Sequence, residues 1–516
     1  MREAKICEKQ PKITCRHARN PLFNFEFNRS VKLRSQTANV TANAGVLLLR
    51  EADHCLDITQ DIVAKLHDHR HPDFIRYPLA ELLRERIYAL ALGHSRQDDA
   101  DILAHDPAFK TAVWQRPGCR VADERLASQP TVSRFMSILA QEQNLEKLRE
   151  AISLPLLRHQ RCGQEDRRVS LGVVDIDGFP IETHGEQPGA AYNGYYQKTI
   201  YSPLAAYFST NGDFTSRRLG DGFLHAKLRI GNAPPAGDAE LFLDQVMDKA
   251  RQLARTVAIR IDAGFADAKL FNRIDRAGAR FTVRLPSNPA IDRLAQPFLV
   301  RPSGRPPKNG YEFAIELTGY INPGWDRQYR VILVVVDKPD KNGWLSLFPN
   351  YFFIATNWPD ESMSPWRIVE HYRQRGTFED RLGEWNALGV NLSQDSFEKN
   401  EATLLLSMLA FNLLEILRRE IESATDIRLN PPAAIDSGWD MSRLRNILLK
   451  AGAVLSRGGR RLWFDLAEGI APLWQSILER IRRWRKRESP IRHPPTSHPG
   501  FAPLPGHAFL KYMPRL

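Results

Sequence analysis

Cysteine is scarce in this chain of 516 residues, and its five cysteines stand far apart. No two of them form a Cys-x2-Cys pair, so the sequence indicates neither a zinc site nor a disulfide framework. We therefore expect reduced thiols with a structural role. The five are Cys7, Cys15, Cys55, Cys119 and Cys162.

Long apolar runs are also missing. No run reaches the length of about 20 apolar residues that a bilayer-spanning helix needs. The segment that begins MREAKICEKQPKITC lacks the apolar core of a signal peptide. The sequence thus predicts a cytoplasmic protein without a membrane partner.

Acidic residues are outnumbered, with 60 Asp and Glu against 72 Lys and Arg, which gives a net charge of +12. A positive excess of this size attracts polyanions, and nucleic acid is the expected partner. An anionic membrane surface would instead call for a basic amphipathic helix with an apolar face. The charge alone does not decide the matter, because many basic proteins bind no DNA.

Composition and periodicity divide the chain into six regions. The predicted regions are a flexible arm at 1–45, a helical region at 46–165, the first part of an α/β core at 166–285, a mostly β insertion at 286–350, the second part of the core at 351–430, and a basic helical region with a disordered tail at 431–516.

Two helices are predicted in the second region. Apolar residues recur at spacings of three and four from Leu79 to Ala91. Ser128 and Pro130 then form a typical helix start. Arg134 projects from this second helix, either toward a DNA groove or simply into solvent.

From residue 168 the pattern becomes mixed α/β. The predicted strands are 169–177, 200–208, 214–219 after a turn at Asn211-Gly212, 257–261, 280–285, 311–320, 329–337 and 351–356. The predicted helices are 242–253, 266–277, one that starts at Ser364-Pro365, and 403–417. This order predicts a mixed sheet with flanking helices.

Two aspartate positions stand at predicted strand ends. Asp175 and Asp177 share one face of their strand, where two carboxylates need a cation or solvent. Asp262 follows a short buried-type strand, at the edge where α/β proteins place their sites. A solvent-exposed strand end and a helix cap are the alternative interpretations.

A polar stripe is the most specific pattern. On a continuous helix Tyr372, Arg375, Glu379 and Asn386 would point to about 0°, 300°, 340° and 320°, which is one narrow face. Such a stripe is not core unless it lines a polar site. The alternative is an ordinary surface salt bridge between Arg375 and Glu379.

These residues resemble those of a known family. The stripe is similar to the Tyr-x2-Arg-x3-Glu-x6-Lys signature of bacterial insertion-sequence transposases that carry a β insertion before the catalytic glutamate. The segment 260–265 resembles the second-aspartate motif of that group, and 175–177, 183–187 and 192–196 resemble the first-aspartate region of the "thirteen-eighty" insertion-sequence family. The resemblance extends over most of residues 45–485.

The resemblance implies a DDE transposase with an RNase H-like fold. Asp177, Asp262 and Glu379 would hold two Mg²⁺ ions, which Mn²⁺ can replace, and Asp175 is the alternate first ligand. The implied substrates are double-stranded element ends and target DNA. A homodimer on paired ends and a place at the nucleoid follow by the same analogy.

Two positions depart from the family pattern. Asn386 stands where the signature has lysine, which would keep a hydrogen bond to a phosphate but lose the charge. Phe179 stands where a threonine is common, and this leaves the choice between Asp175 and Asp177 open.

Further residues are candidates for DNA contact. The basic run at 480–487 suits phosphates, although a solvated helix end is the alternative. His184 and Lys198 could reach DNA or be structural, and Trp325 could stack on a flipped base, although a core position is favoured. The predicted DNA-binding residues are Tyr372, Arg375, Asn386, Lys198, Arg482, Arg483, Arg485 and Lys486.

Three other functions compete with transposition. A nuclease with the same carboxylates would cut without joining, and an inactive DNA-binding relic would have lost its chemistry. The intact trio argues against the relic, whereas Asn386 and Phe179 keep it open. A retaining glycosidase explains neither the basic charge nor the polar stripe.

Overall fold

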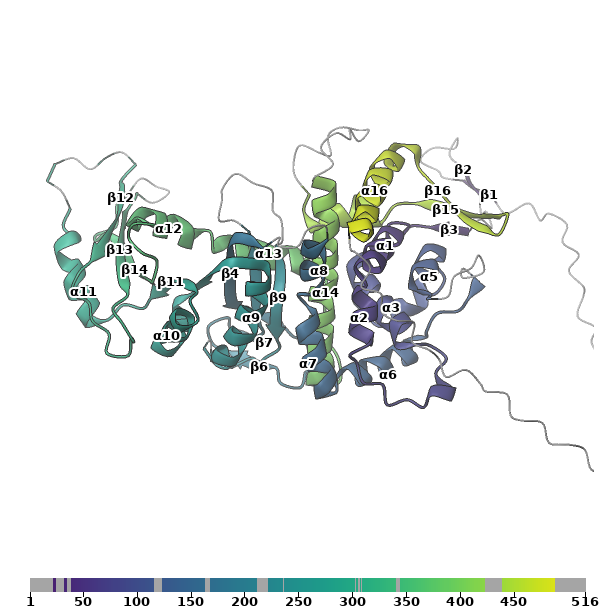
Figure 1. Cartoon of the computed structure of the whole chain (residues 1–516), viewed down its shortest axis with the longest axis horizontal. Coiled ribbons are helices and arrows are strands. Elements are labelled where there is room, and N and C mark those ends of the chain that lie inside the picture. Colours follow the sequence, from purple (N-terminus) through teal and green to yellow (C-terminus); the bar gives the residue numbers. More distant parts are fainter. Residues whose placement is uncertain are drawn as a thin grey trace, which may run out of the picture.

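The structure is a computed structural model. It describes residues 39–115, 123–162, 168–210, 221–234, 236–301, 303–304, 307, 309–339, 344–422 and 439–484, together with the backbone of 22–24, 32–34 and 485–487. Figure 1 shows an elongated molecule, with a helical region at one end and a large sheet that extends to the other.

The helical region holds both helices predicted there. Its elements are α1 (Val46–Leu56), α2 (Ile58–Val63), η1 (Pro72–Phe74), α3 (Leu79–Leu92), α4 (Asp99–Leu103), α5 (Pro107–Val113), α6 (Gln129–Leu139), α7 (Glu142–Ala151) and α8 (Leu154–Arg161). Helix α6 begins after Ser128, as predicted. Helix α3 differs from its predicted two-faced pattern, because all its residues are buried. Its Arg84 is held inside by Thr59 and Asp53.

The large sheet has the strand order β12-β13-β14-β11-β10-β4-β8-β9. Strand β10 runs parallel to β4 and β11, and the remaining pairs are antiparallel. The strands are β4 (Val169–Gly178), β8 (Leu204–Ser209), β9 (Gly222–Lys227), β10 (Ala254–Ile261), β11 (Arg280–Leu285), β12 (Tyr311–Leu317), β13 (Arg330–Asp337) and β14 (Asn350–Thr356). A mixed α/β architecture is thus confirmed.

Helices connect the strands of this sheet. Helix α9 (Ala239–Leu253) leads into β10, and η3 (Ala263–Phe265) and α10 (Ala268–Arg276) lead from β10 to β11. The predicted insertion contains α11 (Pro289–Ala295), η4 (Gln296–Phe298), β12 and β13. Its two strands do not form a separate sheet. They extend the main one, because β13 pairs with β14.

The predicted strand 200–208 is wrong as a single element. It is split at Pro203 into β7 (Lys198–Tyr201) and β8. Strand β7 belongs to a small sheet with β5 (Ile181–Glu182) and β6 (Ala191–Asn193). Proline has no N–H for a strand ladder, so the chain changes sheets there. The predicted strand 214–219 and its turn lie outside the described residues, and β8 pairs instead with β9.

The chain then returns through two helices that approach the sheet. Helix α12 (Pro365–Arg373) begins as predicted, with Ser364 accepting a hydrogen bond from the Arg367 N–H. Helix α13 (Gly376–Asn386) follows after a short break. The predicted continuous helix through 372–386 is therefore wrong, for a reason given below.

The C-terminal region is less helical than predicted. After α15 (Met441–Leu444) and the π-helical turn η6 (Arg445–Leu449), a hairpin of β15 (Ala453–Gly458) and β16 (Arg461–Leu466) precedes η7 (Glu468–Ile470) and α16 (Ala471–Arg487). Strand β15 also pairs with β3 (Asn39–Thr41), within the predicted arm. Strands β1 (Leu22–Asn24) and β2 (Lys32–Arg34) pair with each other. The predicted tail beyond 490 lies outside the described residues.

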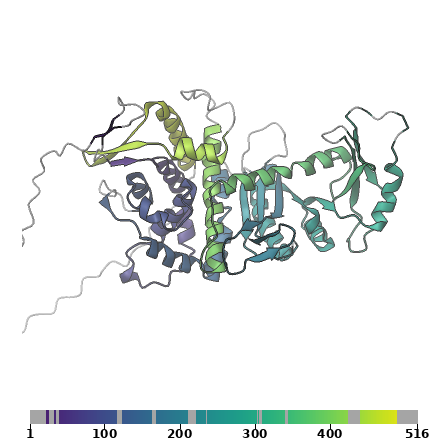
Figure 2. The same ribbon diagram turned by 180° about the vertical axis from the view of Figure 1, so that it is seen from behind.

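Helix α14 (Phe397–Glu422) stands between the two ends of the molecule, as Figures 1 and 2 show from opposite sides. It is the one described helix long and apolar enough to cross a membrane, but its most apolar window is fully buried within the protein. It contacts α1, α3, α7, α8, α16 and β9. Helix α14 is therefore the core helix that joins the helical region to the sheet.

Asn412 of α14 fastens this junction. Its side-chain amide donates to the carbonyls of Ile152 (2.7 Å) and Phe223 (2.8 Å) and accepts from the Phe223 N–H (2.9 Å). Strand β9 is an edge strand of the sheet. Asn412 therefore bonds to the N–H and the carbonyl of Phe223, which would otherwise lack a strand partner on that side.

Removal of a buried side chain from α14 should destabilise the protein. Leu413 is fully buried, so Leu413→Ala should lower the free energy of unfolding by about 2–5 kcal/mol through lost burial and a cavity. Leu241 on α9 is 66% exposed, and Leu241→Ala should change it by less than about 0.5 kcal/mol. Thermal unfolding midpoints compare the two. Equal midpoints would contradict a core role for α14.

Candidate active site

Two aspartates lie at the ends of neighbouring parallel strands. Asp177 is near the end of β4, and Asp262 follows β10 directly. The register pairs Ile176 with Ile261, which places the two carboxylates at the same edge of the sheet. The sequence predicted that each aspartate stands at a strand end, and the family resemblance implied that the two share one site.

The pKa of Asp177 reflects this crowding. Burial raises the pKa of Asp177 to about 6, the Arg375 guanidinium opposes the shift, and the Asp262 carboxylate adds to it. The Gly178 N–H donates to Asp177 Oδ1 at 2.9 Å. A carboxylate that is costly to ionise beside a second carboxylate is ready to receive a positive charge.

Asp175 lies in a different environment from Asp177. It is buried opposite Arg260 of β10, whose Nε and Nη2 reach its two oxygens at 2.7 and 2.6 Å. Burial raises the pKa of Asp175, and Arg260 acts in the opposite direction. Both carboxylate oxygens are therefore already bonded within the protein.

Arg260 also determines where α12 ends. Its Nη1 donates to the His371 carbonyl at 2.8 Å and approaches Gln374 Oε1 at 3.4 Å. In a continuous α-helix the His371 carbonyl would accept the Arg375 N–H. Instead that N–H bonds to the Tyr372 carbonyl at 2.9 Å, which tightens the turn and separates α12 from α13.

Two of the four predicted side chains beside this break contact the aspartates directly, and Glu379 is connected to them only through Arg375. The Tyr372 hydroxyl donates to Asp262 Oδ1 at 3.4 Å. Arg375 forms a short ion pair with Asp177 through Nη2 and lies 3.5 Å from Glu379 Oε1 through Nη1. Asn386 is exposed at the end of α13, and no described side-chain contact links it to this group.

The three predicted ligands, Asp177, Asp262 and Glu379, are of the type that binds a divalent metal, but their side chains do not lie together in one cluster. Carboxylate oxygens are the ligands that Mg²⁺ prefers. Among the described residues, however, no three His, Cys, Asp or Glu side chains lie close enough to hold an ion. The Glu379 side chain is 68% exposed, and Arg375 lies between it and Asp177.

Two further side chains lie near this site, and neither of them had a predicted role. Tyr196 precedes β7, and burial raises its pKa, with Asp177 and Asp262 both contributing. Arg284 of β11 is exposed above the Phe352 ring. Burial raises the pKa of Tyr372 to about 12, and the positive charge of Arg284 acts in the opposite direction. Tyr196 belongs to a segment that carried the family resemblance, which was the available signal. Arg284 had none.

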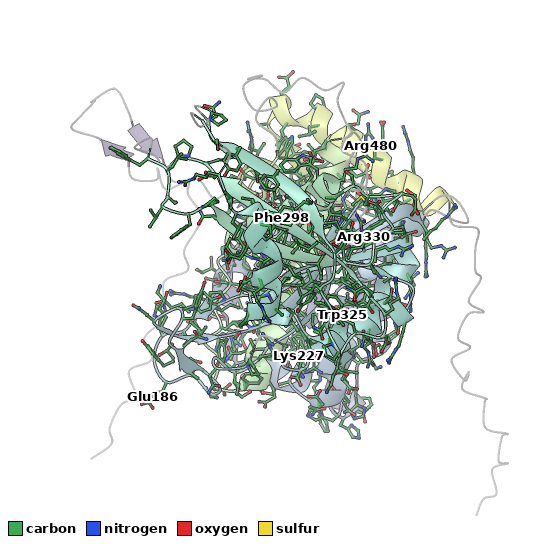
Figure 3. The ribbon with its side chains drawn as sticks, turned by 90° about the vertical axis from the view of Figure 1, so that its left-hand side faces the viewer. Glu186, Lys227, Phe298, Trp325, Arg330 and Arg480 are labelled. Carbon is green, nitrogen blue, oxygen red and sulfur yellow. The ribbon has the colours of Figure 1, made fainter. Side chains whose placement is uncertain are left out.

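Other predicted contact residues lie in varied surroundings. Lys198 is paired with Glu182 at 2.6 Å, and His184 is exposed. Trp325, labelled in Figure 3, is 9% exposed and packs against Phe271, Tyr320 and Tyr329, as its favoured interpretation predicted.

The basic run lies on α16, where Figure 3 labels Arg480. Arg482 and Arg483 are exposed, and Trp484 is buried against the His159 ring. The side chains of Arg485 and Lys486 lie outside the described residues.

The contrast between the two first-strand aspartates is testable by stability. Asp175→Ala leaves Arg260 buried without its anion and should lower the free energy of unfolding by about 3–5 kcal/mol. Asp177→Ala removes a partly exposed ion pair with Arg375 and also the repulsion between Asp177 and Asp262. It should therefore change the free energy of unfolding by less than about 1 kcal/mol. Urea unfolding measures both. A larger loss for Asp177→Ala than for Asp175→Ala would reverse the assignment.

Comparison with known proteins places the chain in a family. The model of the family "Transposase DDE domain group 1" matches residues 23–486. No curated protein sequence matches the chain. Among solved structures, the chain is similar to the piggyBac transposase in a synaptic complex with hairpin DNA, with a TM-score of 0.41, 12% identity, and coverage of 88% of this chain and 87% of that one. That likeness is too distant to support an argument. The family match covers most of the sequence, and the chain therefore belongs to the transposase DDE domain group 1 family.

Proposed function

We propose that this member of the family is a DNA transposase that cuts at the ends of an insertion sequence and joins the strands to target DNA. Asp177, Asp262 and Glu379 are the proposed catalytic residues. The observation that carries the proposal is the pair of aspartates on neighbouring strand ends, with Glu379 connected to Asp177 through Arg375. We further propose that the mixed sheet with its helices is an RNase H-like core and that the chain is of the "thirteen-eighty" type.

Mg²⁺, or Mn²⁺ in its place, is the proposed cofactor, held by the same three carboxylates. Asp177 is preferred to Asp175 as the first ligand, because Arg260 occupies both oxygens of Asp175. Two such ions, held by these carboxylates, would supply activation of the attacking water or 3′-hydroxyl and stabilisation of the leaving oxygen.

The chain's own side chains prepare this site. Tyr372 orients the Asp262 carboxylate through its hydroxyl. Arg375 compensates the charge of Asp177 and holds Glu379 nearby. Both side chains lie beside the carboxylates, where they would also meet a scissile phosphate.

The two departures from the family pattern leave this site intact. Phe179 is buried edge-on against the Trp385 ring, with centroids 5.6 Å apart, so it serves packing. Asn386 stands apart at the end of α13. Neither observation favours an inactive relic.

The proposed partners are double-stranded element ends and target DNA. A homodimer on paired ends and a location at the nucleoid in the cytoplasm complete the proposal.

The catalytic assignment predicts a sharp difference between neighbouring carboxylates. Glu379→Gln and Asp262→Asn should each lower DNA cleavage by about three orders of magnitude or more, because the metal ligands are lost. Asp380 is also exposed on α13 and serves as the matched control, so Asp380→Asn should cleave normally.

The assay uses Mg²⁺ and a duplex that carries the inverted repeats flanking the gene, with DNA binding measured separately by mobility shift. Normal cleavage by Glu379→Gln would refute the site. Cleavage without joined product by the unaltered protein would indicate a nuclease.

Arg375 should oppose metal binding by its charge. Charges of +1 and +2 about 6 Å apart in water repel by about 1.4 kcal/mol, so Arg375→Gln should raise Mn²⁺ affinity about tenfold. Isothermal titration calorimetry with Mn²⁺ measures this on the full chain. Arg367→Gln, an exposed position on α12, should leave the affinity unchanged. Weaker binding by Arg375→Gln would show that Arg375 mainly positions the ligands.

A further inference from the structure

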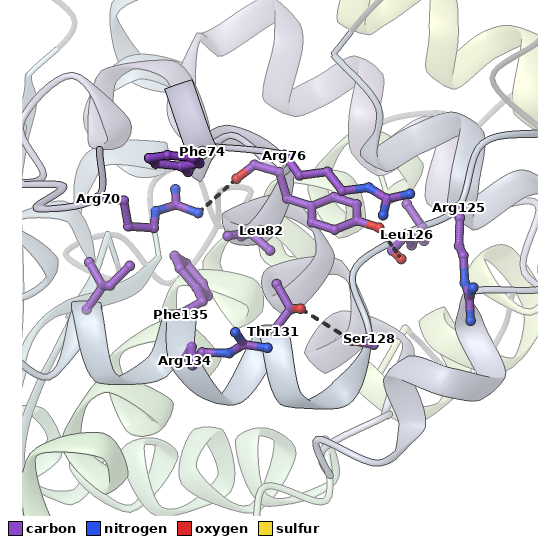
Figure 4. Close-up of a pocket in the computed structure, with 12 residues that line it drawn as sticks. Arg70, Phe74, Arg76, Leu82, Arg125, Leu126, Ser128, Thr131, Arg134 and Phe135 are labelled. Carbon is purple, nitrogen blue, oxygen red and sulfur yellow. Dashed lines mark hydrogen bonds between the residues drawn. The ribbon is translucent and has the colours of Figure 1, made fainter. Parts of the chain in front are cut away.

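A second basic feature lies in the helical region, away from the carboxylates. A pocket of about 450 Å³ opens between the segment around η1, the start of α3 and helix α6 (Figure 4). Four arginines line it, and its described lining contains no Asp or Glu. We call it the arginine pocket; the four are Arg70, Arg76, Arg125 and Arg134.

Three of these four guanidinium groups carry a positive charge that no described acidic side chain compensates. Arg70 is neutralised by Asp68, which its Nε and Nη2 contact at 2.8 and 2.7 Å. Arg76, Arg125 and Arg134 are exposed, and none of them has an ion pair with a described acidic side chain. Arg76 lies over the Tyr77 ring at 5.4 Å, and Arg134 Nε donates to the Pro130 carbonyl at 3.1 Å.

The start of α6 adds to the positive potential. Ser128 makes no side-chain cap bond to a backbone N–H of the helix, and its hydroxyl lies 3.3 Å from the Thr131 hydroxyl. The partial positive charge of a helix N-terminus favours an anion there. Both residues line the pocket and are drawn in Figure 4.

The pocket also has an apolar side, which distinguishes its ligand from a free anion. Phe135, Leu82 and Leu126 are buried beneath it, and Phe74 at its rim is 85% exposed. The backbone of duplex DNA presents phosphates together with the less polar faces of its sugars, and it matches such a mixture.

We propose that the arginine pocket grips the phosphate backbone of duplex DNA at a distance from the catalytic carboxylates. The inference rests on the proposed function, since the DNA held there is the DNA that is cut. Arg76, Arg125 and Arg134 each contact a phosphate, and Arg70 with its Asp68 partner shapes the wall.

The test is the salt dependence of DNA binding. Each phosphate contact contributes about 0.9 to the slope of log affinity against log salt, so the Arg76→Ala, Arg125→Ala, Arg134→Ala triple variant should lose about 2.7 from that slope. Fluorescence anisotropy with a labelled mixed-sequence duplex measures it on the full chain. The three side chains are exposed, so the thermal midpoint should not change.

Arg293→Ala is the matched control. Arg293 is also an exposed helical arginine, and its Nε donates to the carbonyl of Pro289, four residues earlier, at 3.1 Å, as Arg134 does to Pro130. Its loss should leave the slope unaltered.

The outcomes separate this inference from the proposed function. An unchanged slope in the triple variant, while the unaltered protein binds DNA, overturns the arginine pocket alone. Failure of the unaltered protein to bind the duplex overturns the proposed function and this inference together. A changed oligomeric state of the triple variant by light scattering, with an unaltered slope, would make the pocket a protein interface and overturn the proposal.

Discussion

One buried guanidinium determines the geometry on which the site depends. Arg260 joins strand β10 to strand β4 through Asp175 and to the end of helix α12 through the His371 carbonyl. A buried charge pair is costly to break, because either partner alone is left unsolvated in the interior. Asp262 follows two residues after Arg260, and Asp177 two after Asp175. The same contact therefore fixes both strand ends and the point from which Tyr372 and Arg375 extend.

The sequence predicted what local pattern controls. The strands that end at Asp177 and Asp262 were predicted because their apolar runs are continuous, and α12 because Ser364 and Pro365 form a helix start. The break before α13 was missed, because its cause is Arg260, more than a hundred residues away in the chain. Tyr372 and Arg375 still reach the aspartates across this break, whereas Glu379 reaches only Arg375.

Pairing between distant segments was the other part that local pattern could not supply. Strand β9 is buried on both faces and shows no alternation, and the β15–β16 hairpin lies in a region that was predicted to be helical. The insertion's strands were predicted, but their union with the main sheet depends on β14. The choice between Asp175 and Asp177 also required the structure, because the two side chains share one face of the strand and differ in the arginine that each contacts.

The Asn412 amide has a consequence for how the molecule can move. Three hydrogen bonds from one side chain tie α14 to the sheet edge at Phe223 and to the helical region at Ile152. Because an amide both donates and accepts, neither aspartate nor leucine can reproduce all three bonds. The sheet edge and the helical region are thereby attached to α14 at the same residue. Any ligand that touched both the helical region and the sheet edge would therefore meet two surfaces that one buried side chain joins.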